Sequence, residues 1–196
     1  YHKFRIGRIV TRALIFPGQG SQVVGMGKEL AKAFPEARQV FEEVDDALKH
    51  KLSSLIFEGP EEDLILTENA QPALLAVSIG LIRVLQSQAN FNVADGCSFV
   101  AGHSLGEYSA LTAAGAFEVQ DAVRTLRTRG RAMQEAVPLG EGAMAALIGV
   151  DLNVAEEIAL EAAGDEVCTT ANDNAPGQIV LSGSVKAVER AIEIGK

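Results

Sequence analysis

The pentapeptide Gly-His-Ser-Leu-Gly at residues 102–106 constrains the fold of this chain more than any other segment. It follows the apolar run Ser98–Ala101 and leads into a helix-forming segment that begins at Leu105. A G-x-S-x-G pattern between a strand and a helix is typical of a sharp turn that pushes the serine hydroxyl out of the sheet. A Cβ at either glycine is expected to clash with a neighbouring strand or helix. We therefore predict that Ser104 is a nucleophile beside a helix N-terminus that can hold an oxyanion, the alternative being a plain glycine-rich turn with an incidental serine.

A second glycine-rich loop follows another short apolar run near the start of the chain. Residues 13–16 are Ala-Leu-Ile-Phe, and residues 16–22 read Phe-Pro-Gly-Gln-Gly-Ser-Gln. The glycines on either side of Gln19 allow its backbone to approach another segment or a ligand closely. A turn that only connects a strand to a helix is the alternative explanation.

Together, the segments FPGQGSQ and GHSLGEYSAL resemble the malonyl-CoA:acyl carrier protein transacylases of fatty acid synthesis and the acyltransferase domains of polyketide synthases. The resemblance extends through residues 71–75, 129–138, 142–149 and 172–178, and so covers almost the whole chain from residue 13. The joint occurrence of these motifs in this order makes the resemblance to the family highly specific. It implies an enzyme that transfers a malonyl group from malonyl-CoA to the thiol of acyl carrier protein through a malonyl-serine intermediate, with no cofactor and no metal.

The resemblance also implies roles for individual residues. Ser104 is the nucleophile, and the backbone N–H groups of Gln19 and Leu105 form the oxyanion hole. Arg129 grips the free carboxylate of the malonyl group. The substrate pocket is further lined by Gln71, Met133, Asn172 and Asn174. For the two asparagines, turn chemistry before Pro176-Gly177 is an equally good explanation.

Arg129 also stands out without the resemblance, because of its position in the helix expected over about residues 120–137. An apolar stripe at helical spacing is formed by Ala122, Leu126, Gly130, Met133 and Val137. Arg129 falls on or beside this stripe, and an arginine turned inward needs an anionic partner. Helix geometry alone slightly favours a structural ion pair or a rim position. The resemblance favours the substrate carboxylate, which a guanidinium binds bidentately and which distinguishes malonyl from acetyl.

Three other arginines of this helix, Arg124, Arg127 and Arg131, fall on one face. Because carrier proteins are acidic, this face is a candidate docking surface. A solvated face that neutralises nearby acids is the alternative, and it is at least as good an explanation.

Hydrophobic periodicity predicts alternating strands and helices, hence an α/β fold. Strands are expected near 12–16 and 98–102, and helices are expected over 23–33, from Pro35, and from Gln71-Pro72 to about Gln88. The last of these has almost no polar face, so it should be deeply buried. The resulting large domain, residues 13–138, is expected to be α/β-hydrolase-like with a parallel sheet.

The pattern changes from Gly142 onward. Strands at 144–150, 166–172 and 178–183 and helices at 153–163 and 184–195 are in the order β-α-β-β-α. This order predicts an inserted ferredoxin-like small domain over residues 139–196 that lacks its last strand. Both domains are thus expected to be truncated at the C-terminus, and the basic residues 1–12 are expected to be an extension outside the fold.

Activation of a serine needs a histidine within hydrogen-bond reach, and the chain contains three. His2 lies in the basic extension, His50 follows a polar helix end, and the side chain of His103 should diverge from that of Ser104. In the family that the chain resembles, the catalytic histidine lies in a later segment. We therefore expect residues 1–196 to be the N-terminal part, or the ordered part, of a longer chain.

Composition narrows the alternatives further. The net charge of −9 argues against a nucleic-acid partner, and no apolar run is expected to approach the length of a membrane span. Cys97 and Cys168 are far apart in sequence and signal no disulfide framework or metal site. A cytoplasmic monomer is expected. Two other classes remain open, a general serine esterase of the α/β-hydrolase type and a non-catalytic scaffold module.

Overall fold

The computed structural model describes residues 12–138 and 140–196, so residues 1–11 of the expected basic extension lie outside the described residues. The chain divides into two compact units, the first ending at Met133 and the second spanning Gln134–Lys196. Strands and helices alternate along the chain, and the first unit contains a parallel strand pair. The predicted mixed α/β class with a parallel sheet is therefore confirmed.

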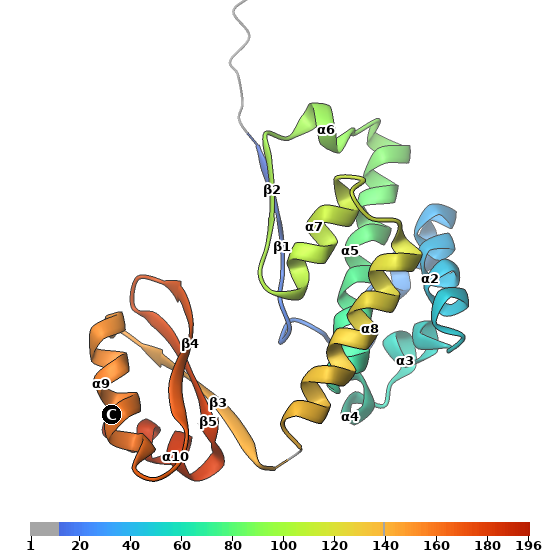
Figure 1. Ribbon diagram of the computed structural model, residues 1–196. Helices are drawn as coiled ribbons and strands as arrows, with labels where there is room; N and C mark the ends of the chain where they lie inside the picture. The colour runs from blue at the N-terminus through green and yellow to red at the C-terminus, as the bar shows by residue number, and fades with distance from the viewer. Residues whose placement is uncertain (1–11, 139) are drawn as a thin grey trace, which may run out of the picture. The chain divides into compact units, whose positions relative to one another are not determined.

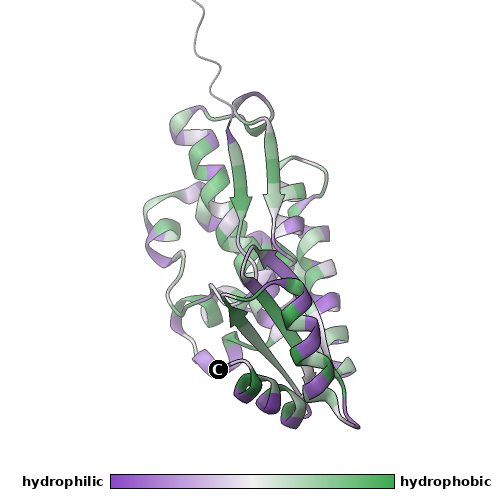
Figure 2. Ribbon diagram, turned by 90° about the vertical axis from the view of Figure 1, so that its left-hand side faces the viewer, coloured by the Kyte–Doolittle hydropathy of each residue, from purple (hydrophilic) through white to green (hydrophobic). Residues whose placement is uncertain are grey.

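The sheet of the first unit consists of β1 (Ala13–Phe16) and β2 (Phe99–Gly102). Both strands are apolar and lie side by side (Figures 1 and 2). They are parallel and in register, with Ala13 opposite Phe99 and Phe16 opposite Gly102. Because the two strands end at the same edge, the chain leaves the sheet at neighbouring points after Phe16 and after Gly102.

Eight helices belong to the described part of the first unit, the last of them running on for three residues into the second. Their bounds are α1 (Lys28–Ala33), α2 (Pro35–Leu48), α3 (Leu52–Glu58), α4 (Glu61–Leu64), α5 (Thr67–Ala89), α6 (Val93–Gly96), α7 (Leu105–Ala113) and α8 (Val119–Ala136). The predicted start of α2 at Pro35 is confirmed, with proline in the first turn, where it lacks no helical partner. The helix expected over 23–33 begins only at Lys28, because Gly25 and Gly27 have φ of 92° and 74°, outside the helical range.

Helix α5 begins one turn earlier than its proline suggested. The N–H groups of Asn69 and Ala70 both donate to the carbonyl of Leu66 at 2.8 Å, which closes a first turn before Gln71. Pro72 therefore lies inside the helix, where it forfeits a single backbone bond. The expectation of deep burial holds for most of the helix, but Leu81 is 47% exposed.

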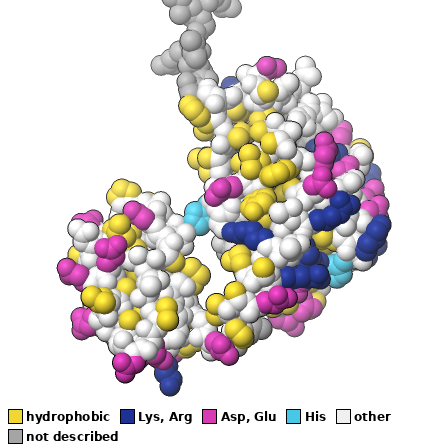
Figure 3. All heavy atoms as spheres, viewed as in Figure 1, with side chains coloured by type: hydrophobic (Ala, Val, Ile, Leu, Met, Phe, Trp, Pro, Cys, Tyr) yellow, Lys and Arg dark blue, Asp and Glu magenta, His cyan; other side chains and the backbone are white. Residues whose placement is uncertain are grey.

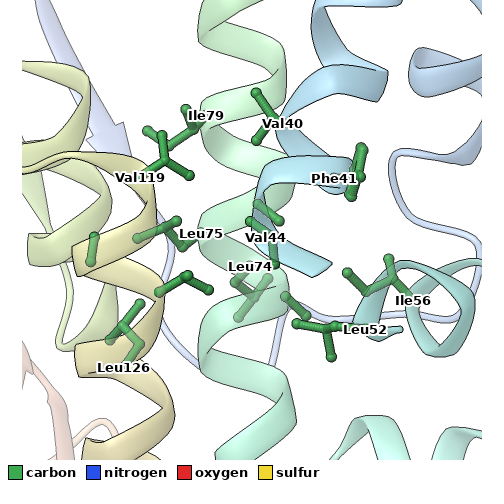
Figure 4. Close-up of a cluster of buried hydrophobic side chains, with 14 of the residues drawn as sticks. Val40, Phe41, Val44, Leu52, Ile56, Leu74, Leu75, Ile79, Val119 and Leu126 are labelled. Atoms are coloured by element: carbon green, nitrogen blue, oxygen red, sulfur yellow. The ribbon is translucent and has the colours of Figure 1, made fainter. Parts of the chain in front are cut away.

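The largest hydrophobic core surrounds α5 (Figure 4). Val40, Phe41 and Val44 of α2 pack on one side of the helix, and Val119 and Leu126 of α8 lie on the other. The α5 residues between them include Leu74, Leu75 and Ile79, which are at most 4% exposed. Burial of this kind is the main contribution to the stability of a fold.

This central position explains the composition of α5. It is the one helix among residues 12–138 and 140–196 that is long and apolar enough to cross a membrane, with 23 residues and a mean hydropathy of 1.3 over its most apolar 18 residues. The expectation that no segment approaches this length was therefore wrong. Of the most apolar window, 61% is buried inside the structure, so packing against α2 and α8 accounts for its apolar side chains.

The start of α5 is clamped to α8. Gly130 lies so close that a Cβ there would be 2.5 Å from Glu68 Cα and 2.7 Å from the Thr67 carbonyl oxygen. Glu68 Oε2 accepts hydrogen bonds from Arg131 Nε at 2.8 Å and from Arg127 Nη1 at 3.2 Å. The bond from Arg131, together with the charges of both arginines, holds the pKa of Glu68 below its ordinary value, against the opposing effect of burial.

Glu68→Gln is expected to lower the free energy of unfolding by about 1–2 kcal/mol at pH 7. A carboxylate with a depressed pKa stabilises the fold above its unfolded-state pKa and loses this effect as the pH falls through the folded-state pKa. The difference between wild type and variant should therefore shrink below about pH 4. Urea denaturation at pH 7 and pH 3.5 measures it. Asp121→Asn is the matched control, because Asp121 pairs with Arg124 at 70% exposure, and a Glu68→Gln deficit of equal size at both pH values would contradict the clamp.

The second unit contains a three-stranded sheet and two helices. Its elements are β3 (Gly142–Ile148), α9 (Leu152–Ala163), β4 (Cys168–Ala175), β5 (Gln178–Ser184) and α10 (Val185–Ile194). The sheet order is β3-β5-β4, and both pairs are antiparallel. Its separate core lies between the helices and one face of the sheet, with Ile179, Leu181 and Ala187 at most 1% exposed.

Candidate active site

The G-x-S-x-G segment forms the predicted sharp turn between β2 and α7. Ser104 is the residue before α7 and has φ 55° and ψ −111°, a conformation that non-glycine residues rarely adopt. A Cβ at Gly102 would lie 1.9 Å from the Gly106 carbonyl carbon, and one at Gly106 would lie 2.4 Å from the Phe16 oxygen. Both glycines are therefore required, one against the helix and one against the neighbouring strand. The Ser104 hydroxyl does not cap the helix and stays available.

The second glycine-rich loop, residues 17–22, packs directly on this turn. A Cβ at Gly18 would lie 2.5 Å from His103 Nδ1, and the His103 N–H donates to the Phe16 carbonyl at 3.2 Å. Gln19 therefore lies next to the serine turn, as the parallel strands require. Within residues 12–138 and 140–196, the backbone N–H groups of Gln19 and Leu105 have no hydrogen-bond acceptor. Two such donors beside a nucleophile suit an oxyanion.

Arg129 reaches the Ser104 hydroxyl from α8. Its Nη2 donates to Ser104 Oγ at 2.9 Å, and its Nη1 donates to Gln71 Oε1 at 2.6 Å. The guanidinium also lies over the Tyr108 ring, 5.9 Å from the centroid. No Asp or Glu of the described residues lies within ion-pair distance of it. The ion-pair alternative therefore finds no partner among the described residues, and a half-buried cation faces the serine without an anion.

Gln71 accepts a hydrogen bond from Arg129 and restricts the position of its guanidinium. Its side chain is fully buried on α5, and its Nε2 donates to Met133 Sδ at 3.4 Å. The structure therefore gathers five predicted residues within one unit: Ser104, Gln19, Leu105, Arg129 and Gln71, with Met133 at the edge of the cluster.

The predicted apolar stripe of α8 holds only for its first half. Ala122, Leu126 and Gly130 are buried, but Met133 is 47% and Val137 50% exposed. The reason is that α5 begins opposite Gly130, so later residues of α8 extend beyond the end of their packing partner.

Asn172 and Asn174 belong to the second unit. Both lie on β4, which continues to Ala175, three residues beyond its expected end. The register of β4 with β5 shifts twice there, between Thr170 and Asn172 and again between Asp173 and Ala175. The turn itself consists of Pro176 and Gly177, with φ 77° at the glycine.

Sequence reasoning missed two residues of the site. Tyr108 lies in the first turn of α7, directly after the serine turn, and its ring contacts the Arg129 guanidinium. Thr67 accepts a hydrogen bond from Gln19 Nε2 at 3.3 Å through its Oγ1. No local pattern marks Thr67, because its partner is 48 residues away.

The arginine face of α8 is paired with acids. Figure 3 shows Lys and Arg side chains alongside Asp and Glu side chains on the surface of the first unit. Arg124 bonds to Asp121 at 3.1 Å, and Arg127 and Arg131 share Glu68. The side chain of Arg127 is only 12% exposed. These contacts favour the neutralising role over a free basic patch.

No group of three or more His, Cys, Asp or Glu side chains in the described part of the chain could hold a metal ion. The chemical resources of the site are a strained serine, two free backbone donors and a guanidinium. This set can form and stabilise an ester with an acyl group that carries its own carboxylate.

Comparison with known proteins gives the same family throughout. The chain is 52% identical over 185 residues to the malonyl CoA-acyl carrier protein transacylase of Bacillus subtilis, covering 94% of this chain and 57% of that protein. Its structure matches the acyl-carrier-protein-S-malonyltransferase of Bartonella henselae with a TM-score of 0.90 at 59% identity, covering 95% of this chain and 59% of that one.

A third match is a malonyl-transacylase solved in complex with its type II PKS acyl-carrier protein, with a TM-score of 0.87 at 45% identity. It covers 95% of this chain and 59% of that chain. The chain thus spans somewhat under three-fifths of the length of these relatives. The family model for the acyl transferase domain matches residues 13–195, and the chain therefore belongs to the acyl transferase domain family.

Proposed function

We propose that the protein of which this chain is part transfers a malonyl group from malonyl-CoA to the thiol of acyl carrier protein, in fatty acid biosynthesis. The observation that carries the proposal is the 2.9 Å contact between Arg129 Nη2 and Ser104 Oγ, made by a guanidinium with no carboxylate partner in residues 12–138 and 140–196. A malonyl thioester has its carboxylate one methylene from the reacting carbonyl. A cation in contact with the nucleophile suits an acyl group of that length.

In the first half-reaction, Ser104 Oγ attacks the thioester carbonyl carbon and loses its proton to a general base. The carbonyl oxygen becomes an oxyanion, which the N–H groups of Gln19 and Leu105 stabilise. The C–S bond then breaks and CoA leaves as the thiol. In the second half-reaction, the thiol of the carrier protein attacks the malonyl-Ser104 ester and frees the serine.

The general base is assigned to neither described histidine. His50 is exposed at the end of α2 and borders the cleft that Arg127 and Arg131 line, on another part of the unit. The His103 ring lies against Gly18, and its backbone is part of the serine turn. The activity is therefore proposed for the full-length protein.

The finer description of the fold is also a proposal. The parallel pair with its serine turn supports an α/β-hydrolase-like large domain over residues 13–138. The sheet order β3-β5-β4 with α9 and α10 supports a ferredoxin-like small domain over 139–196. The resemblance of residues 172–178 to the family supports a further proposal, that Asn172 and Asn174 line the substrate pocket. We further propose a cytoplasmic monomer.

The experiment incubates full-length protein with malonyl-CoA in the presence and absence of acyl carrier protein. Malonyl-carrier protein should form, and little free malonate should appear when the carrier is absent. An esterase would release malonate at similar rates under both conditions, and a non-catalytic module would consume no malonyl-CoA. Either result would refute the proposal.

A further inference from the structure

The first five residues of α5 contact two parts of the site, the glycine-rich loop and the Arg129 guanidinium. Thr67 Oγ1 accepts the hydrogen bond from Gln19 Nε2, and Gln71 Oε1 accepts the hydrogen bond from Arg129. Thr67 and Gln71 are four residues apart, so their side chains lie on the same face of the helix. A single turn of α5 therefore binds the glycine-rich loop through Thr67 and the Arg129 guanidinium through Gln71.

The position of this turn relative to α8 is fixed by backbone contact. Gly130 leaves no space for a Cβ against Glu68 and Thr67, and Arg127 and Arg131 on either side of Arg129 both bond to Glu68. The first turn of α5 is therefore held rigidly against α8, and so are the positions of Thr67 and Gln71.

The loop, in contrast, has few restraints of its own. Gly20 has φ 106°, and two hydrogen bonds, from Gly20 N to Gln22 Oε1 and from Ser21 Oγ to the Gly18 carbonyl, stay inside the loop. Among the described residues, the bond from Gln19 to Thr67 is the one hydrogen bond that ties residues 17–22 to another element. Glycine-rich segments have many conformations available, so this bond restricts where the Gln19 N–H points.

We propose that Thr67 is a positioning residue whose hydroxyl holds the Gln19 side chain and thereby fixes the Gln19 backbone N–H for the oxyanion. The inference rests on the proposed function. Loss of the Thr67 hydroxyl should affect all acyl groups equally, because an oxyanion forms with every acyl group. Loss of Gln71 should affect only an acyl group with a carboxylate, because Gln71 acts through Arg129.

Thr67→Val in the full-length protein removes the hydroxyl and keeps the shape. The rate constant for acylation of Ser104 should fall roughly three- to tenfold, the size expected for one lost hydrogen bond. The fold-change should be the same with malonyl-CoA and acetyl-CoA, with KM unchanged. Thr67→Ser should restore the rate. Thr125→Val is the control, because its hydroxyl bonds only to the Asp121 carbonyl within α8.

Gln19→Met supplies a second test from the other partner, since it removes the amide and keeps the backbone N–H. The double variant Thr67→Val/Gln19→Met should lose no more activity than either single variant, because both remove the same bond. Stopped-flow acylation of all variants, with thermal unfolding to confirm the fold, gives the data.

Several results would overturn the inference. A wild-type rate in Thr67→Val, a loss confined to malonyl-CoA, or additive losses in the double variant would each show that the hydroxyl does not position the loop. These results are distinct from failure of the proposed function, which is measured on the wild-type protein. In that case wild type would either consume no malonyl-CoA or release malonate at similar rates with and without carrier protein, and the inference would fall with it.

Discussion

Arg129→Ala should lose malonyl transfer by about 2–4 kcal/mol of transition-state binding, or roughly 30- to 1000-fold in kcat/KM. The guanidinium is the one cation bonded to Ser104 among the described residues, and its removal leaves the malonyl carboxylate unpaired in a partly desolvated site. Acetyl transfer should fall much less, because acetyl has no carboxylate to satisfy. Steady-state kinetics with both acyl-CoA donors measures the ratio.

Arg124→Ala is the matched control for this variant, since Arg124 lies on the same helix and pairs with Asp121 at the surface. Its kinetics should resemble wild type. Equal losses of malonyl and acetyl transfer in Arg129→Ala would show that Arg129 supports the site structurally rather than selecting the substrate.

Gln71→Glu is expected to weaken the preference of the site for malonyl over acetyl. The substitution preserves shape and places a carboxylate at the position of an amide oxygen 2.6 Å from Arg129 Nη1. An internal ion pair then competes with the malonyl carboxylate for the same guanidinium. Malonyl transfer should fall by about 2 kcal/mol or more, roughly 30-fold, while acetyl transfer changes little.

Gln86→Glu, at an exposed position of the same helix, controls for the added charge. Gln71→Met tests the bond without introducing a charge and should cause a smaller loss of malonyl preference. If Gln71→Glu kept its preference for malonyl, the bond from Arg129 to Gln71 would have no part in selection.

The features predictable from sequence are those encoded locally. The serine turn was recognisable because both glycines, the serine and the flanking apolar run lie within ten residues, and each glycine is required by direct backbone contact. The meeting of Gln19 with Ser104 was also predictable, because two strands that run parallel bring their following loops to one edge.

The features that escaped prediction depend on contacts between distant segments. The start of α5 at Thr67 was hidden by Pro72, which usually marks a first turn but here lies in the second. The sharing of Glu68 by Arg127 and Arg131 joins residues about 60 positions apart, so the sequence showed only a basic face. The bond from Thr67 to Gln19 spans 48 positions and likewise has no local signature.

The half-buried state of Arg129 was ambiguous for a related reason. Helical spacing placed it beside an apolar stripe, which is equally compatible with an ion pair and with a ligand site. Only the three-dimensional arrangement shows that its nearest partners are a hydroxyl, an amide and a ring, none of them anionic.

The most direct test of the account is the covalent state of Ser104 after the full-length protein is mixed with malonyl-CoA in the absence of carrier protein. Intact-mass and peptide mass spectrometry should find one malonyl group on the peptide that contains Ser104, and acyl carrier protein should remove it. Ser104→Ala should carry no adduct. A malonyl group that persists in Ser104→Ala, or that the carrier protein fails to remove, would contradict the account.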